Sequence, residues 1–264
     1  MKNRKILIFT DLDGSVLHRE TFMFDEVKEF VKEFDKNDLI IIPNTSKTQI
    51  EIENFLEELD ISCPYISENG SSIHMLSIID QRLPNEIVLS RKKEEIFEIF
   101  NRNIEGNLKF KCQFINSLSN FKKIEILGLP KSKINDALNR KYTLPFKFTG
   151  TTKEKEYLFN QVLNIGLKIQ EGDRVLNLGD DVSKGLATKK LISYLDKDDI
   201  VTVAIGDSSN DLDMLEVADF PCLIKNNESN FKGLITKNYI RSSLEAPSGW
   251  VEVVRLVLTK LNYN

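Results

Sequence analysis

Two aspartates one residue apart, Asp11 and Asp13, are the first candidates for chemistry along the chain. They directly follow the apolar run at 6–9, which predicts a short buried strand of a parallel sheet. Alternation along an extended chain sends both carboxylates to the same side, and Gly14 permits a turn behind them. Carboxylates held close together repel each other, and a bound cation would relieve that repulsion. A surface Asp-Gly turn explains the same residues without any chemistry.

Asp207 and Asp211 form a second acidic pair, after the apolar run at 200–205. A spacing of four residues around a helix start brings both carboxylates to one face, where they could hold a metal ion together. The same residues could instead cap the helix, because Asp and Asn side chains accept hydrogen bonds from its first turn. Both interpretations stay open for this segment alone. Taken together with Asp11 and Asp13, the metal site is favoured.

A parallel sheet would bring the two acidic pairs to one edge. Continuous apolar runs at 39–42 and 200–205 predict further buried strands, and apolar stripes at helical spacing predict helices between them. This alternation implies right-handed crossovers and ligand binding beyond the carboxyl ends of the strands, where Thr45 also lies. The other expected elements here are helices at 24–35, 48–59, 184–195, 211–218 and 249–261, and strands at 64–67, 71–76 and 220–224.

From about residue 83 the pattern changes to a mixture of short strands and helices. Such a mixture, without long buried runs, indicates an α+β module with one solvated sheet face. The expected elements are strands at 86–89, 123–127, 146–149 and 173–178, and helices at 91–101, 131–139 and 153–167. We therefore predict an α/β protein with a core from residues 1–83 and 181–264 and an inserted module at 84–180.

The composition narrows the class of protein. The net charge of −4 and the pI near 5.5 argue against a nucleic-acid binder, which would present a basic face. The three cysteines lack CxxC spacing, which fits reduced thiols in the cytosol. No run approaches the roughly 18 apolar residues of a membrane span, and the first apolar run is too short for a signal peptide. We expect a soluble, cytoplasmic protein that does not bind membranes. These patterns do not indicate an oligomeric state.

The chain resembles the haloacid dehalogenase superfamily of phosphohydrolases in four motifs that occur in the family's order. They are Asp11-Leu12-Asp13-Gly14-Ser15, the strand 40–44 ending at Thr45, Ser183-Lys184-Gly185, and Gly206-Asp207-Ser208-Ser209-Asn210-Asp211. Ser15 stands where the family commonly has Thr. The resemblance implies a Rossmann-like parallel-sheet core, with the inserted α+β module between the second and third motifs as a cap domain that sets substrate specificity.

The resemblance also implies a reaction, phosphoryl transfer through an aspartyl-phosphate with Mg²⁺ as cofactor. Asp11 would be the nucleophile, and Asp13 would protonate the leaving group and then activate water. Thr45 and Lys184 would hold the phosphate and screen its charge. The implied metal-binding residues are Asp11, Asp13 through its backbone carbonyl, Asp207 directly, and Asp211 through water or a neighbouring contact.

A narrower resemblance is to mannosyl-3-phosphoglycerate phosphatases, and it implies hydrolysis of that phosphorylated sugar to mannosylglycerate, a compatible solute. The segments that carry it are Thr45-Ser46-Lys47-Thr48, Ser67-Glu68-Asn69-Gly70, Leu127-Gly128-Leu129-Pro130, Arg140 to Pro145, and Ala246-Pro247-Ser248-Gly249-Trp250. The implied substrate-binding residues are Ser46, Lys47, Glu68, Asn69, Arg140 and Asn210. A cation such as Lys47 or Arg140 would recognise the glycerate carboxylate, and Arg174 has a similar role with thinner support.

Three alternatives stay open. The first is a phosphatase for glucosyl-3-phosphoglycerate or another sugar phosphate, because the cap residues that select the sugar are not identified by the motifs. The second is a phosphomutase of the phosphomannomutase type, which carries similar motifs. The third is a catalytically silent binding protein, which is disfavoured because every acid that the mechanism needs is present. A histidine-based mechanism has little support, since the chain has only His18 and His74.

Overall fold

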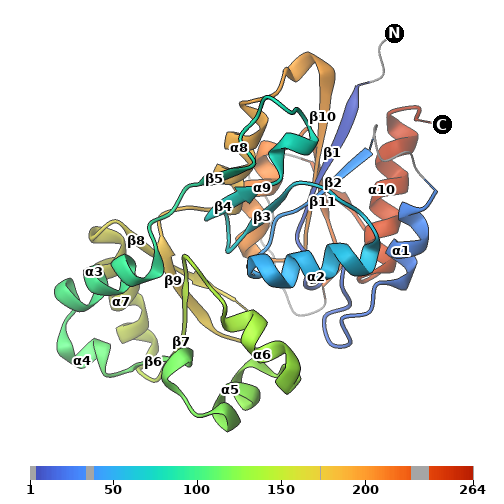
Figure 1. Cartoon of the computed structure of the whole chain (residues 1–264). Coiled ribbons are helices and arrows are strands. Elements are labelled where there is room, and N and C mark those ends of the chain that lie inside the picture. The colour runs from blue at the N-terminus through green and yellow to red at the C-terminus, as the bar shows by residue number, and fades with distance from the viewer. Residues whose placement is uncertain (1–3, 34–38, 173, 227–237, 264) are drawn as a thin grey trace.

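A five-stranded parallel sheet forms the centre of the core (Figure 1). The structure is a computed structural model that describes residues 4–33, 39–172, 174–226 and 238–263. The strand order is β12–β11–β10–β1–β2. The strands are β1 Lys5–Thr10, β2 Leu39–Pro43, β10 Ile200–Gly206, β11 Phe220–Leu223 and β12 Ile240–Arg241.

The register of this sheet brings the ends of its central strands together. Thr10, the last residue of β1, pairs with Ile205 in β10 and with Pro43 in β2. The three strands are buried almost throughout, as their continuous apolar runs predict. The residues that follow the strands therefore meet at one edge of the sheet, as expected from the sequence.

Helices cover both faces of the sheet. In Figure 1, α1 and α10 pack together on one side, and α8 and α9 pack together on the other. The core helices are α1 Asp25–Val31, α2 Gln49–Leu59, α8 Lys184–Ile192, α9 Leu212–Val217 and α10 Ser248–Lys260, with 3₁₀ turns at Leu76–Ile78, Lys197–Asp199 and Ser209–Asp211. Residues 34 and 35, predicted as the end of the first helix, lie outside the described residues. Among the helices of the described ranges, none is long and apolar enough to span a bilayer.

A small antiparallel sheet extends the core beside β2. It contains β3 Tyr65–Ser67, β4 Ser72–His74 and β5 Glu86–Val88. A parallel bridge between Asn44 and Ile66 joins β3 to the end of β2. The sequence assigned β5 to the inserted module, but β5 pairs with β4, and Ile87 packs against the core. We therefore place the start of the module after residue 89.

Residues 90–180, which we call the cap, lie beside the core (Figure 1). They fold around a hydrophobic cluster of their own. Its antiparallel sheet has the order β6–β7–β9–β8, and Phe100 of α3 and Leu158 of α7 are fully buried against it. The strands are β6 Cys112–Phe114, β7 Leu144–Phe148, β8 Leu167–Glu171 and β9 Leu176–Asp180. The helices are α3 Lys93–Asn103, α4 Gly106–Lys109, α5 Asn120–Leu127, α6 Lys131–Leu138 and α7 Thr152–Asn164, with a 3₁₀ turn at Ile115–Ser117.

Two predictions for the cap are wrong. The strand predicted at 123–127 is the end of helix α5, because Ser119 caps that helix and Gly128 ends it at a φ of +60°. The helix predicted at 153–167 stops at Asn164, since Gly166 adopts a φ of +71°. The strands β6 and β8 were not predicted.

Candidate active site

Three buried carboxylates meet where β1 and β10 end. The backbone N–H of Asp11 donates to the carbonyl of Ile205 at 2.9 Å, which aligns the two strand ends. Asp207 follows β10 directly, and Asp211 ends the 3₁₀ turn behind it. One oxygen from each of Asp11, Asp207 and Asp211 lies within 4.8 Å of the other two. The structure thus brings Asp11 of the first acidic pair together with both members of the second pair, which lies about 200 residues later in the sequence.

Lys184 is the cation inside this cluster. Its Nζ lies 2.5 Å from Asp11 Oδ1 and 2.7 Å from Asp211 Oδ1, and only 1% of its side chain is exposed. Lys184 begins helix α8, whose N-cap residue Ser183 accepts a hydrogen bond from the N–H of Leu186. Asn44, just after β2, donates through Nδ2 to the carbonyl of Lys184 at 3.0 Å. Lys184, at the start of α8, is therefore contacted by residues that follow β1, β2 and β10.

Burial and the mutual repulsion of the carboxylates raise the pKa values of Asp11 and Asp207. Burial raises the pKa of Asp11 to about 8; Lys184 opposes this, while Asp211 and Asp207 add to it. Burial also raises the pKa of Asp207 to about 6, with Asp211 adding to the effect and Arg19 opposing it. Burial would lower the pKa of Lys184, but Asp11 and Asp211 together outweigh it and raise that pKa. A further cation at this place would stabilise the ionised carboxylates.

The oxygens of Asp207 and Asp11 fit a hard divalent cation such as Mg²⁺, which prefers carboxylate ligands. Asp207 Oδ1 is buried without a hydrogen-bond partner among the described residues. Asp207 Oδ2 contacts Arg19 and accepts from Asn226 Nδ2 at 2.9 Å. Gly14 lies so close that a Cβ there would be 2.5 Å from Asp207 Oδ2, which explains why the first motif needs a glycine at this place.

Asp211 combines the two interpretations that the sequence left open. Its Oδ2 accepts from the backbone N–H groups of Asp207 and Ser208, each at 3.1 Å, which is a capping interaction. Its Oδ1 faces Lys184. The carboxylate therefore shapes the turn after β10 and also belongs to the charged cluster.

Asp13 lies beside the cluster, at the edge of a cavity. Its Oδ2 is 2.8 Å from Lys47 Nζ, and its Oδ1 is buried without a hydrogen-bond partner among the described residues. Burial would lower the pKa of Lys47, but Asp13 and Glu51 outweigh it and raise that pKa, so Lys47 stays charged. Asp13 is thus oriented by a cation that comes from the segment after β2.

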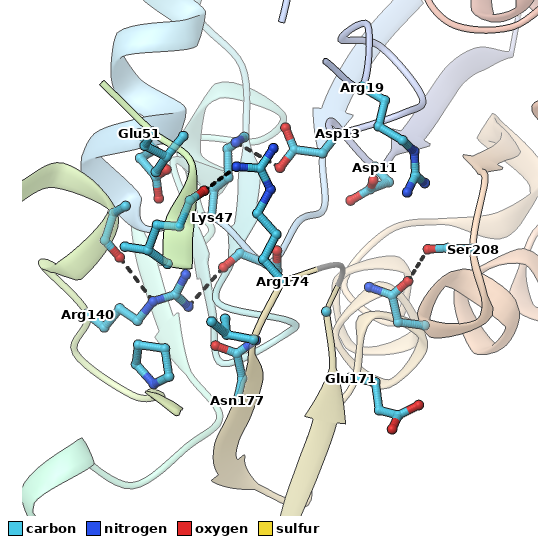
Figure 2. Close-up of a pocket in the computed structure, with 18 of the residues that line it drawn as sticks. Asp11, Asp13, Arg19, Lys47, Glu51, Arg140, Glu171, Arg174, Asn177 and Ser208 are labelled. Atoms are coloured by element: carbon cyan, nitrogen blue, oxygen red, sulfur yellow. Dashed lines mark hydrogen bonds and ion pairs between the residues drawn. The ribbon is translucent and has the colours of Figure 1, made fainter. Parts of the chain in front are cut away.

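A cavity of about 540 Å³ separates the core from the cap at this point (Figure 2). Core residues Asp11 and Asp13 line one side of it, and residues of the cap line the other. Of the predicted substrate-binding residues, the cavity wall contains Ser46, Lys47, Arg140 and Asn210, and it also contains Arg174. Five separate parts of the sequence, including the turn with Asp11 and Asp13, therefore face one space.

Arg140 and Arg174 extend from the cap into this space (Figure 2). Arg140 Nη1 donates to the carbonyl of Ser46 at 3.1 Å, so this cap residue is held directly against the core. Arg174 Nη1 donates to the carbonyl of Leu127 at 2.5 Å and passes over Gly128. A Cβ at Gly128 would lie 1.6 Å from that nitrogen, so the glycine leaves room for the guanidinium group.

Six predicted site residues do not line the cavity. Three of them, Lys184, Asp207 and Asp211, belong to the buried charged cluster, and the others are Thr45, Glu68 and Asn69. Thr45 is fully buried, and its Oγ1 accepts from the N–H of Lys47 at 3.3 Å. Glu68 and Asn69, which were predicted to bind the substrate, are not part of the cavity wall. The carboxylate of Glu68 is turned toward the cap backbone, and Asn69 is buried with its N–H bonded to the carbonyl of Thr45 at 2.9 Å.

Sequence reasoning missed Arg19, Asn226 and the role of Trp250. A lone arginine or asparagine in a loop carries no pattern, and their contacts with Asp207 appear only in three dimensions. Trp250 Nε1 donates to Thr10 Oγ1 at 3.0 Å, and Thr10 Oγ1 donates to the carbonyl of Asp11 at 2.8 Å. The C-terminal helix therefore supports the end of β1 from behind.

Comparisons with known proteins agree with this geometry. A family model described as haloacid dehalogenase-like hydrolase matches residues 8–242. A glucosyl-3-phosphoglycerate/mannosyl-3-phosphoglycerate phosphatase from Methanococcoides burtonii is 26% identical, over 98% of this chain and 99% of that protein. A mannosyl-3-phosphoglycerate phosphatase from Pyrococcus horikoshii is 30% identical, over 81% of this chain and 88% of that protein.

Solved structures share the fold at lower identity. A protein from Thermoplasma acidophilum superposes with a TM-score of 0.67 at 16% identity, over 99% of this chain and all of that one. A sucrose-phosphatase from Synechocystis, solved with sucrose and phosphate, superposes with a TM-score of 0.63 at 12% identity, over 96% of this chain and 98% of that one. The α/β architecture with its parallel central sheet is therefore that of these proteins.

Proposed function

The chain belongs to the haloacid dehalogenase-like hydrolases, and we propose that it removes the phosphate of a glycosyl-3-phosphoglycerate through a phosphorylated Asp11. The chain is a phosphoric monoester hydrolase, because it belongs to this family and is similar to phosphatases named for sugar phosphoglycerates. This similarity supports a phosphorylated sugar as its substrate. The observation that carries the proposal is the buried cluster of Asp11, Asp207, Asp211 and Lys184 at the end of a cavity with basic walls.

In the proposed reaction Asp11 attacks the phosphorus atom, and the bond to the ester oxygen breaks. Asp13 gives its proton to the leaving oxygen, and the resulting carboxylate then takes a proton from the water that hydrolyses the aspartyl-phosphate. Lys47, 2.8 Å from Asp13, orients this acid toward the cavity. Lys184, 2.5 Å from Asp11, reduces the repulsion between the nucleophile and the phosphate.

Mg²⁺ would be held by the carboxylates of Asp11 and Asp207 and by the backbone carbonyl of Asp13, with Asp211 supporting the site. When bound, it would supply charge neutralisation that lets two anions approach each other. The unpartnered Oδ1 of Asp207 and the raised pKa values of Asp11 and Asp207 support this assignment.

The favoured substrate is mannosyl-3-phosphoglycerate, and glucosyl-3-phosphoglycerate is the second candidate. The two relatives described above are named as phosphatases for these compounds. Both carry a carboxylate beside the phosphate, which suits a cavity lined by Lys47, Arg140 and Arg174. A guanidinium group makes charge-assisted hydrogen bonds to a carboxylate, so these arginines would favour a phosphoglycerate over a sugar phosphate that lacks a carboxylate.

Phosphate release in the presence of Mg²⁺ from a panel of esters tests this proposal. The panel contains mannosyl-3-phosphoglycerate, glucosyl-3-phosphoglycerate, sucrose-6-phosphate, trehalose-6-phosphate and mannose-6-phosphate. We expect the highest kcat/KM for one of the two phosphoglycerates, with the first favoured. Release only from the sugar phosphates that lack a carboxylate would reject the substrate class. Release from none by a folded protein would reject the proposed function.

A further inference from the structure

Glu68 joins the core to the cap through an unusually complete set of hydrogen bonds. Its Oε1 accepts from the N–H of Lys141 at 2.7 Å, and its Oε2 accepts from the N–H groups of Tyr142 and Thr143 at 3.1 and 2.8 Å. Thr143 Oγ1 also donates to Oε2 at 2.6 Å. Glu68 is 1% exposed, although it comes from the core and its four partners come from the cap. A buried carboxylate with several backbone donors makes strong, directional contacts.

The backbone that presents Glu68 is held in an unfavourable conformation. Glu68, Asn69 and Gly70 have φ values of +46°, +60° and +94°, so three successive residues adopt positive φ. Residues other than glycine rarely adopt a positive φ, and such conformations persist where the surrounding structure enforces them. Here the N–H of Glu68 donates to the carbonyl of Lys47 at 2.9 Å, and that of Asn69 donates to Thr45 at 2.9 Å.

The same loop touches the helix start that carries Lys184. A Cβ at Gly70 would lie 2.2 Å from the carbonyl oxygen of Ser183 and 3.2 Å from the N of Lys184. The loop therefore packs between the segment after β2 and the beginning of α8.

On the cap side, the segment that Glu68 holds also carries Arg140. Arg140 Nη1 donates to Thr143 Oγ1 at 3.0 Å, and this hydroxyl in turn donates to Glu68. Arg140 Nη1 also donates to the carbonyl of Ser46 at 3.1 Å. A continuous set of hydrogen bonds thus runs from the core through Glu68 and Thr143 to a cation in the cavity wall.

We propose that Glu68 is a positioning residue that fastens cap residues 141–143 to the core and thereby fixes Arg140 over the reaction site. It does not touch the substrate. The kinetic part of this inference rests on the proposed function, whereas the fastening itself can be measured without any substrate. Glu68 would matter for substrates that reach the cap and would matter little for a small ester held by the core alone.

Backbone hydrogen exchange on the full chain tests the fastening. In Glu68→Gln, one acceptor oxygen becomes an NH₂ group that faces backbone donors, so the amides of residues 141–143 should exchange about tenfold or more faster. Lys141→Ala is the matched control, because it removes only the exposed contact between Lys141 Nζ and Gln49 Oε1 at 2.7 Å and keeps the backbone N–H. Unchanged exchange in Glu68→Gln would overturn the proposal.

Steady-state kinetics tests the consequence for the reaction. For mannosyl-3-phosphoglycerate, Glu68→Gln should lower kcat/KM about tenfold or more, while for p-nitrophenyl phosphate the change should stay within about threefold. Lys141→Ala should leave both values as in the wild type. Equal losses on both esters would overturn the proposal, since Glu68 would then act on the core alone.

A second variant keeps the test decisive if Glu68→Gln folds poorly. Thr143→Val removes the hydroxyl that connects Glu68 to Arg140, so it should reproduce the selective loss on the larger ester. The two substitutions together should cost less than the product of their separate effects, since they interrupt one network. If the loss in the double variant equals the product of the two single losses, the two residues act independently and the proposed network is contradicted. If the wild type hydrolyses no phosphoglycerate, the proposed function fails, and the exchange measurement still decides the role of Glu68.

Discussion

Gly14 shows how closely single residues are fitted around the acidic cluster. It has a φ of +82°, and a Cβ there would lie 2.5 Å from Asp207 Oδ2. We predict that Gly14→Ala weakens Mg²⁺ binding about tenfold or more and lowers the free energy of unfolding by about 1–2 kcal/mol, because the carboxylate must move and the backbone is strained. Calorimetric titration with Mg²⁺ and thermal unfolding measure the two effects.

The control for this substitution is Gly106→Ala. Gly106 begins helix α4 and adopts no positive φ, and a Cβ there would meet no atom of the described residues within 4 Å. The control should bind Mg²⁺ like the wild type and be as stable or slightly more stable. Equal Mg²⁺ affinity in both variants would show that Gly14 does not shape the site.

Residues that repeat a known pattern could be placed from sequence, whereas residues defined by a contact could not. Asp11, Asp207 and Asp211 were predicted to meet because each follows a strand of one parallel sheet. Arg19 was not predicted, because only the folded loop brings it to Asp207. Glu68 was assigned to the substrate because its motif lies near the site, but the direction of a side chain in a loop of positive φ is not encoded by spacing.

At the scale of elements, one ion pair joins the two chain segments that enter and leave the cap. The N–H and Nε of Arg91 donate to the carboxylate of Asp180 at 2.6 and 3.0 Å. Burial alone would raise the pKa of Asp180, but the hydrogen bonds from Arg91 outweigh it and lower that pKa. Because the pKa is lower in the folded chain, the pair stabilises the fold at neutral pH, and this stabilisation is lost as the pH falls through the folded value.

We therefore predict that Asp180→Asn lowers the free energy of unfolding by about 1 kcal/mol at pH 7, a modest value because Arg91 is partly exposed. The difference from the wild type should shrink below about pH 4. Asp181→Asn is the control, since Asp181 is exposed and lies 3.5 Å from Lys168. Denaturant unfolding at several pH values measures the effect; a difference that does not change with pH would contradict it.

The helices and strands of the core could be predicted because their signals lie within short stretches of the sequence. Continuous apolar runs mark β1, β2 and β10, and Thr48 forms a capping box with Glu51 at the start of α2. The cap was harder. The alternation Ile124-Glu125-Ile126 favours a strand, but Ser119 and Gly128 cap the segment as a helix with no buried residue. The strand β8 was not predicted, because the predicted helix was continued to residue 167, past the turn at Gly166.

At the scale of the whole molecule, two hydrophobic clusters create the cavity by staying separate. The core cluster supports the strand ends, and the cap cluster supports the segments with Arg140 and Arg174. The sequence predicted this division through the change in pattern near residue 83. The boundary was placed too early, because whether β5 pairs with the core or with the cap depends on its partner β4.

The proposed metal site is a property of the assembled molecule, since the segments after β1 and β10 jointly supply its acids. We predict that a chelator stops phosphate release and that Mg²⁺ restores it. Saturating Mg²⁺, at about 100 times its Kd, should also stabilise the fold by about 2.7 kcal/mol, because it binds only the native arrangement. Asp207→Asn should lose this stabilisation, whereas Asp213→Asn, on the neighbouring helix α9, should keep it. Chelator-resistant turnover would contradict the metal site.

The role of Asp11 is tested by comparing wild type and Asp11→Asn in Mg²⁺-dependent phosphate release from mannosyl-3-phosphoglycerate. The variant keeps the size of the side chain and its contact with Lys184 but loses the nucleophilic oxygen. We predict that turnover falls about a thousandfold or more, while circular dichroism stays that of the folded wild type. A folded Asp11→Asn variant with turnover close to that of the wild type would contradict the assignment of Asp11 as the residue that accepts the phosphate.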